Sequence, residues 1–225
     1  MNRHLSYCVV ICILLLPLLW SCEKDNTPVS VSDIDGNVYQ TLEINNKVWM
    51  AENLRTTRFS DGEEIKLVTK NTEWMKNHEP GFAWYNNDSS MFKVPYGGLY
   101  NAYAAMDERI CPEGWHVPSL EEIKSLVSSL GDSTSAGGKL KVEGLSQWHS
   151  PNTGGGNSSG FSALPAGLRY FEGTFSSLSY FTAFWTTTEA DSSSAYFLGL
   201  SYLDATASIS KKSKKNGFSI RCIKD

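Results

Sequence analysis

Residues 111–130, with the sequence CPEGWHVPSLEEIKSLVSSL, constrain the fold of this chain more than any other stretch. Pro118 ends a preceding strand, because proline cannot donate a backbone hydrogen bond. Ser119 and Glu122 have the spacing of a capping box at a helix N-terminus. Gly131 can adopt the left-handed geometry that ends a helix. The apolar residues in between share one helical face: Leu120, Ile123, Leu126, Val127 and Leu130. The stretch therefore predicts an amphipathic helix.

The first 21 residues have the features of a bacterial lipoprotein signal peptide. Residues 8–20 form an almost unbroken apolar run that is too short to span a bilayer comfortably. Ser21 and Cys22 follow, and this order resembles the lipobox, in which the cysteine becomes lipidated. We predict a signal peptide over residues 1–21 and attachment to the membrane through a lipid on Cys22. The alternatives are an ordinary cleaved signal and a single anchoring helix.

Residues 22–32 are polar and are expected to form a short tether, followed by one domain over residues 33–225. Glu23 and Asp25 resemble the acidic export signals of Bacteroidetes surface lipoproteins. We therefore expect an outer-membrane location, with the cell surface and the periplasmic face as the two alternatives. Removal of the signal leaves 225 − 21 = 204 residues, enough for a sizeable core, and a formal net charge of −5 instead of −4, since Arg3 is lost. This mild acidity argues against a nucleic-acid partner.

The cysteines predict one disulfide. Of the five, Cys8 and Cys12 lie in the signal peptide and Cys22 is the lipidation site. Two cysteines in an exported protein, Cys111 and Cys222, favour a bond between them. Closing a loop of this length would add roughly 4–5 kcal/mol in the chain-entropy model. The alternative is a pair of buried free thiols.

Alternating apolar residues predict a hairpin near the start of the domain. Residues 34–44 form the first strand, Asn45 and Asn46 tolerate the positive φ of a tight turn, and residues 47–50 return. The spacing of apolar residues over 99–106 predicts a second, short helix. From residue 161 onward the pattern is that of β-strands joined by turns.

Residues 137–160 are rich in glycine, serine and asparagine and are expected to form a long flexible surface loop. Long loops of this kind often carry binding sites. Its glycine run, residues 154–156, lacks the spacing and the lysine of a phosphate-binding loop. A basic run at residues 211–215 reads as a solvated hairpin tip, and contact with an anionic polysaccharide or a membrane surface is the alternative.

Five segments together resemble the Fibrobacter succinogenes major paralogous domain of bacterial lipoproteins: VYQTLEINNKVWMAENL, YGGLYNAYAA, CPEGWHVPSLEEI, FWTTTEA and NGFSIRCIKD. The resemblance covers residues 33–225. That family is similar to the formylglycine-generating-enzyme domain, a branch of the C-type-lectin-like fold. The resemblance implies an α+β fold in which two helices pack on a twisted, mainly antiparallel sheet, with long loops on one side.

The resemblance also allows the related chemistries to be tested. Formylglycine-generating enzymes bind copper through two cysteines five residues apart on the last strand. Cys222 matches the second, but Gly217 stands at the first, so we expect no copper oxidase and no cofactor. Calcium-binding lectins use an acidic residue before Pro-Asn, where this chain has Ser150 before Pro151 and Asn152. The three histidines after the signal are not spaced as metal ligands, and we expect no metal site.

We therefore expect a binding or interaction module for a glycan or an envelope protein, not an enzyme. Its ligand would contact the loops at residues 137–160 and 176–181. Aromatic rings that could stack on a sugar are Trp148, Tyr170, Tyr180 and Phe181. The alternative for these rings is packing in the core. Two further hypotheses are an enzyme of unknown reaction on the same fold, marked by a pocket with convergent polar groups, and a purely structural surface protein.

Overall fold

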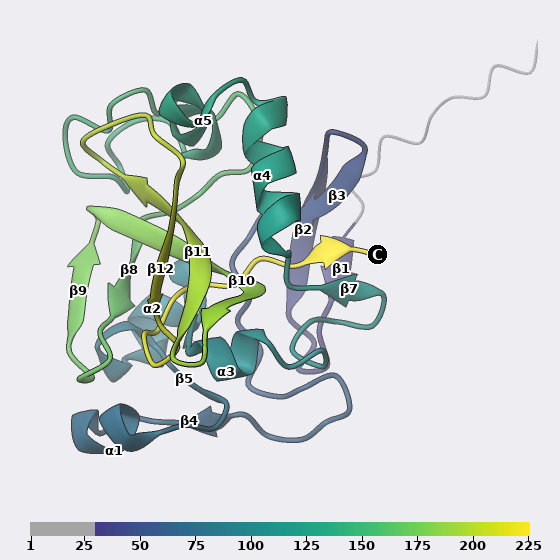
Figure 1. Ribbon diagram of the computed structural model, residues 1–225, viewed down its shortest axis with the longest axis vertical. Coiled ribbons are helices and arrows are strands. Elements are labelled where there is room, and N and C mark those ends of the chain that lie inside the picture. Colours follow the sequence, from purple (N-terminus) through teal and green to yellow (C-terminus); the bar gives the residue numbers. More distant parts are fainter. Residues whose placement is uncertain (1–29) are drawn as a thin grey trace, which may run out of the picture.

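The computed structural model describes residues 30–225, which form an α+β fold with three sheets and several short helices (Figure 1). The predicted signal peptide, the lipidation site Cys22 and most of the tether lie outside these residues. Within the described part of the chain, no helix is long and apolar enough to cross a membrane.

The first sheet joins the two ends of the domain. Its order is β1 (Ser30–Ser32), β2 (Val38–Ile44), β3 (Lys47–Met50), β13 (Ile223–Lys224) and β7 (Trp115–His116). The predicted hairpin is confirmed, since Asn45 and Asn46 adopt φ values of 53° and 58° between β2 and β3. The C-terminal strand inserts between β3 and β7, and Figure 1 shows these N- and C-terminal strands on one side of the molecule.

The second sheet has the order β12 (Ser208–Ser213), β11 (Ser194–Ser201), β10 (Phe181–Asp191), β8 (Ala166–Arg169) and β9 (Phe175–Leu178). All its pairs are antiparallel except β8 with β10. Successive side chains of a strand point to opposite faces. Phe184 and Trp185, neighbours on β10, accordingly lie in two different hydrophobic clusters. The strand β10 therefore separates two cores.

A third, small sheet has the order β4 (Lys66–Leu67), β5 (Gly81–Ala83) and β6 (Leu99–Tyr100). The remaining elements are α1 (Asn71–Lys76), a 3-10 turn (Tyr85–Asn87), α2 (Ser89–Tyr96), α3 (Ala102–Ala105), α4 (Leu120–Ser129) and α5 (Ser133–Leu140). The predicted helix is α4, and both hydrogen bonds of its capping box are present. Gly131 has a φ of 116° just after it, as expected.

The expectation of only two helices is wrong. The predicted helix over residues 99–106 is a strand, β6, followed by the single turn α3, because Asn101 caps that turn through its side chain. The helix α2 was not predicted; it contains Pro95 and a residue with non-helical backbone angles, Val94, and none of its residues is buried. The helix α1 places Trp74 in a small core.

The helix α5 occupies the start of the predicted loop at residues 137–160. Asp132 caps its N-terminus by accepting from the backbone amides of Thr134 and Ser135. Gly137 and Gly138 lie inside it because neighbouring backbone comes very close. A β-carbon at either position would lie 2.3 Å from a carbonyl oxygen of another segment. These glycines therefore allow close packing, although the glycine-rich composition predicted a flexible loop.

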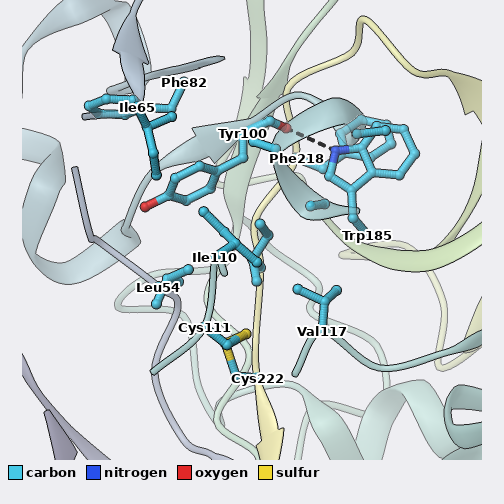
Figure 2. Close-up of a cluster of buried hydrophobic side chains, with 14 of the residues drawn as sticks. Leu54, Ile65, Phe82, Tyr100, Ile110, Cys111, Val117, Trp185, Phe218 and Cys222 are labelled. Atoms are coloured by element: carbon cyan, nitrogen blue, oxygen red, sulfur yellow. Dashed lines mark hydrogen bonds between the residues drawn. A yellow bond between two sulfur atoms is a disulfide. The ribbon is translucent and has the colours of Figure 1, made fainter. Parts of the chain in front are cut away.

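The predicted disulfide is confirmed, so the alternative of two free thiols is wrong. Cys111 and Cys222 are bonded across 111 positions of sequence. Figure 2 shows the bond at one end of a buried cluster, flanked by Leu54 and Val117. At the other end, the indole nitrogen of Trp185 donates to a backbone carbonyl of β6. The disulfide thus joins the segment before α4 to the C-terminal segment within the larger core.

Candidate functional site

The best candidate for a binding surface is a group of three rings, His149, Tyr180 and Tyr202, which we call the aromatic cluster. The rings of His149 and Tyr180 stack, with centroids 4.6 Å apart and planes 23° from parallel. Tyr202 meets them edge-on, at centroid distances of 5.1 Å from Tyr180 and 5.6 Å from His149. Tyr180 is 41 % exposed, His149 is exposed and Tyr202 is half-buried. The cluster therefore presents aromatic surface to solvent.

Backbone hydrogen bonds fix the position of each ring. Tyr180 directly precedes β10 and Tyr202 directly follows β11, so both stand at the open end of one hairpin. The amide of Tyr202 donates to the carbonyl of Tyr180 over 3.0 Å. The amide of His149 donates to the carbonyl of Ser179 over 2.7 Å. The two predicted binding segments, residues 137–160 and 176–181, thus meet at this cluster.

Trp148 was expected to be a stacking ring, and this expectation is wrong. Its side chain is 1 % exposed and belongs to the core beneath α4. Its indole nitrogen donates to the carbonyl of Ala163 over 3.0 Å, so the buried N–H group has a hydrogen-bond partner. The next residue, His149, is exposed at the surface.

Phe181 and Tyr170 lie outside the cluster. Phe181, the first residue of β10, is partly buried and packs against the core that contains Trp185. Tyr170 is 37 % exposed at the turn between β8 and β9, next to the exposed Phe171. That turn is at the far end of the β8–β9 hairpin from Tyr180, because Ala166 and Leu178 pair at the near end. Of the four predicted rings, only Tyr180 belongs to the cluster.

Two members of the cluster were missed by sequence reasoning. His149 was considered only as one of the three histidines without metal-ligand spacing, and Tyr202 only as part of the β-strand pattern after residue 161. The signal that could have identified these two residues is their position, because each lies next to the end of a strand or in a loop near Tyr180. Aromatic residues at strand ends are candidates for surface contacts, since one side of the ring can stay exposed.

A buried lysine lies beneath the cluster. Lys141, the C-cap residue of α5, is fully buried. Its Nζ donates to three backbone carbonyls, those of Thr153 at 2.9 Å, Ser201 at 2.7 Å and Asp204 at 2.8 Å. The same nitrogen lies 5.4 Å from the centroid of the Trp148 ring. Burial lowers the pKa of this ammonium to about 8, and the negative charge of Asp204 opposes the shift.

The loop beside His149 is held by an asparagine. Asn152 is 5 % exposed, and its Nδ2 donates to the carbonyls of Val142 at 3.1 Å and Gly144 at 2.8 Å. The amide group thus organises loop backbone in the Ser150-Pro151-Asn152 segment. Over residues 30–225 no group of three or more His, Cys, Asp or Glu side chains is arranged to hold a metal ion.

Gly217, which stands where the first catalytic cysteine of a formylglycine-generating enzyme would be, is closely packed. A β-carbon at Gly217 would lie 3.0 Å from a side-chain carbon of Arg169 and 3.1 Å from the ring of Trp74. Cys222 is bonded to Cys111 and carries no free thiol. The basic run also differs from the expected hairpin tip, since Lys211 and Lys212 lie in the strand β12. Lys214 is 5 % exposed and donates to a carboxylate oxygen of Glu189 over 2.6 Å, so it is not a solvated tip residue.

A second hollowed region lies on the surface around β4. Two open hollows of about 550 and 500 Å³ share Glu64 and Lys66 in their linings. At the rim, Arg109 binds three carboxylates at 2.6–2.7 Å: Asp61, Glu63 and Asp107. These three carboxylates accept hydrogen bonds from the guanidinium and raise the pKa of Arg109. The region offers paired charges and no exposed ring stack.

The family model of the Fibrobacter succinogenes major domain matches residues 42–224. This range contains α4, both bonded cysteines, Lys141 and the aromatic cluster. Comparison with curated proteins gave no significant match, and comparison with solved structures gave none. The chain therefore belongs to the Fibrobacter succinogenes major domain family.

Proposed function

We propose that this protein is a lipid-anchored protein of the outer membrane whose domain binds a glycan through the aromatic cluster. The observation that carries the proposal is the solvent-facing stack of His149 and Tyr180 with Tyr202 against its edge. The C–H face of a sugar ring is apolar and packs on aromatic surface, while its hydroxyls bond polar ring atoms. Tyrosine and histidine offer both, an apolar body and a polar tip.

The fold that we infer is a branch of the C-type-lectin-like fold. Support comes from the sequence resemblance and from the first sheet, in which strands from both ends of the domain pair around β13. The long segment over residues 141–165 then takes the part of the ligand-binding loop region. The aromatic cluster lies where this segment meets the β10–β11 hairpin.

A partner protein in the envelope is the second candidate ligand. The observation that favours it is the exposed apolar surface of α2, where Met91 is 64 % and Val94 65 % exposed. Solvent-exposed apolar side chains on one short helix are common in protein contacts. We regard the domain as a binding module rather than an enzyme, because the cluster offers stacking surface and no nucleophile paired with a base.

The anchoring part of the proposal has a direct test. Cys22→Ala should abolish lipidation and shift the protein from the membrane fraction to the soluble fraction. Labelling with a radioactive fatty acid, followed by fractionation, measures both effects. A Cys22→Ala protein that stays in the membrane fraction would remove the lipid anchor from the proposal.

The binding part is tested with single-ring variants of the soluble domain. Tyr180→Ala should weaken binding at least tenfold to the glycans that the wild type selects on an array, because it removes half of the stack. Tyr170→Ala is the matched control, since it removes an equally exposed tyrosine outside the cluster. Titration calorimetry with the selected glycan measures the affinities. No binding by the wild type at micromolar concentration, or equal losses in both variants, would contradict glycan binding at the cluster.

A further inference from the structure

We propose that the ammonium group of Lys141 acts as a built-in cation that orders the loops carrying the aromatic cluster, in the place where a metal ion would otherwise cross-link them. This inference rests on the proposed function for its biological meaning. The loop ordering itself is measured without any ligand.

The geometry around Nζ is that of a completed cage. A lysine ammonium has three N–H donors and no acceptor. Each donor of Lys141 has one partner, a backbone carbonyl at 2.7–2.9 Å, and the side chain is fully buried. The three carbonyls belong to two stretches of the chain: that of Thr153 lies in the loop after His149, and those of Ser201 and Asp204 lie at and just after the end of β11. One charged atom therefore joins the segment after His149 to the segment around Tyr202.

The cage is connected to the cluster through the backbone. Ser201 directly precedes Tyr202, so the carbonyl held by Lys141 belongs to the peptide group that leads into this ring. The amide of Thr153 donates to the carbonyl of Tyr202 over 2.9 Å, while the carbonyl of Thr153 accepts from Lys141. The amide of Tyr202 in turn donates to Tyr180. Displacement of the ammonium would therefore affect the positions of all three rings.

A cation suits this cage better than a neutral donor. Three carbonyl oxygens converge on one point, and a buried carbonyl that is left without a hydrogen-bond partner destabilises the fold. Backbone carbonyls are also among the oxygen ligands that Ca²⁺ uses in loops. The ring of Trp148, 5.4 Å from Nζ, adds a cation–π contact. With Nζ at hydrogen-bond distance from all three oxygens, the cage has no room for a second cation.

The packing of α5 presents Lys141 to the cage. The amide of Gly138 donates to Ala205 over 3.0 Å, and its carbonyl accepts from Gly156 over 3.1 Å. The helix backbone thus touches both loops that the cage joins, one turn before Lys141. A positive charge at the C-terminal end of a helix is also favoured by the helix dipole.

The test replaces the built-in cation with a free one. Lys141→Ala should raise amide hydrogen exchange at least tenfold over residues 149–157 and 200–206, with α4 unchanged. Added n-butylammonium, which carries three N–H donors on an apolar stem, should restore protection. Tetramethylammonium, which has the charge but no N–H donor, should not. Lys139→Ala is the matched control, because Lys139 lies on the same helix and donates to one carbonyl, that of Leu130.

Several results would overturn the inference. These are unchanged exchange in Lys141→Ala, equal rescue by tetramethylammonium, or an increase in wild-type exchange over these residues on addition of a chelator. If Lys141→Ala does not fold, the same measurements use Lys141→Met, which keeps the stem without the donors. Variants that stay unfolded in n-butylammonium would also overturn it. Absence of glycan binding by the wild type would contradict the proposed function and leave the exchange result to decide on Lys141.

Discussion

Two neighbouring residues near the C-terminus fasten two different regions of this domain. Cys222 points into the larger core, where its bond to Cys111 lies among apolar side chains. Arg221 points to the opposite side, where its guanidinium packs on the rings of Phe161 and Phe184 beneath the loops. The first region is closed by a covalent bond and the second by charged hydrogen bonds. The two regions differ in the groups that they bury: apolar side chains in the larger core, and backbone carbonyls that need hydrogen-bond partners beneath the loops.

The loop side has backbone carbonyls that no sheet pairs. Arg221 is buried and donates to the carbonyls of Phe161 and Ser162 and to the side chain of Asn53. Lys141 satisfies three more carbonyls, and neither cation hydrogen-bonds a carboxylate. Buried polar backbone needs partners, and long cationic side chains supply several donors from one position. Buried cations can thus order a region of irregular backbone, whereas an apolar core needs only packing.

Loss of the disulfide should have the largest effect. The double variant Cys111→Ser with Cys222→Ser removes a constraint on a loop of 111 residues and should lower the free energy of unfolding by about 4–5 kcal/mol. Urea denaturation of the variant and of the wild type, with and without reductant, measures it. A variant as stable as the oxidised wild type would show that apolar packing alone closes the larger core.

Removal of the buried guanidinium should come next. Arg221→Met leaves three buried acceptors without partners, and we expect a loss of about 3 kcal/mol, because each unpaired acceptor costs about 1–3 kcal/mol and methionine avoids the desolvation of a charge. Arg109→Met is the control. Arg109 binds three carboxylates at the surface, where solvent screening leaves such ion pairs with little effect on stability. Equal losses in the two variants would refute the distinction between buried and surface cations.

The smallest expected effect is a pH dependence at the edge of the first sheet. His116 contacts Asp225 through Nδ1 at 2.6 Å and Glu122 through Nε2 at 3.0 Å. Burial lowers the pKa of His116, but the two carboxylates outweigh it and raise the pKa overall. A raised pKa means that the folded state binds the proton more tightly. The stabilisation is therefore complete below about pH 6.5 and is lost as pH rises through the folded-state pKa.

His116→Gln should accordingly lose up to about 1 kcal/mol near pH 6 and much less near pH 9, since the group is partly exposed. Chemical denaturation at both pH values measures the difference. His78→Gln is the control, because that ring contacts only a tyrosine, Tyr103. A His116→Gln penalty that is the same at both pH values would show that the ring acts by packing alone.

Local signals predicted part of this fold. The capping box of α4 and the Asn45-Asn46 turn depend on residues within a few positions of each other, and both formed as expected. The helix α5 was missed because its two glycines look like a loop. Glycine is needed at both positions because backbone near residues 154 and 206 comes very close. Helix propensity measures the cost of glycine in isolation, and tertiary packing overrode it here.

The candidate site was predicted by segment and not by residue. The meeting of residues 137–160 with residues 176–181 agrees with the structure, and Tyr180 is at the centre. Trp148 and His149 are adjacent, and in the structure Trp148 is buried while His149 is exposed. The larger and more apolar ring took the core, as burial of apolar area favours.

The sequence by itself determined the elements whose signals are local. It also predicted the disulfide, because Cys111 and Cys222 are the two cysteines within the predicted domain over residues 33–225. The tertiary structure decided which aromatic rings gather at the surface and which cations are buried. Lys141 and Arg221 look like any basic residue in the sequence. Their roles depend on carbonyls up to 63 positions away and, for Arg221, on the side chain of Asn53, 168 positions away. Such contacts exist only once the remote segments have packed together.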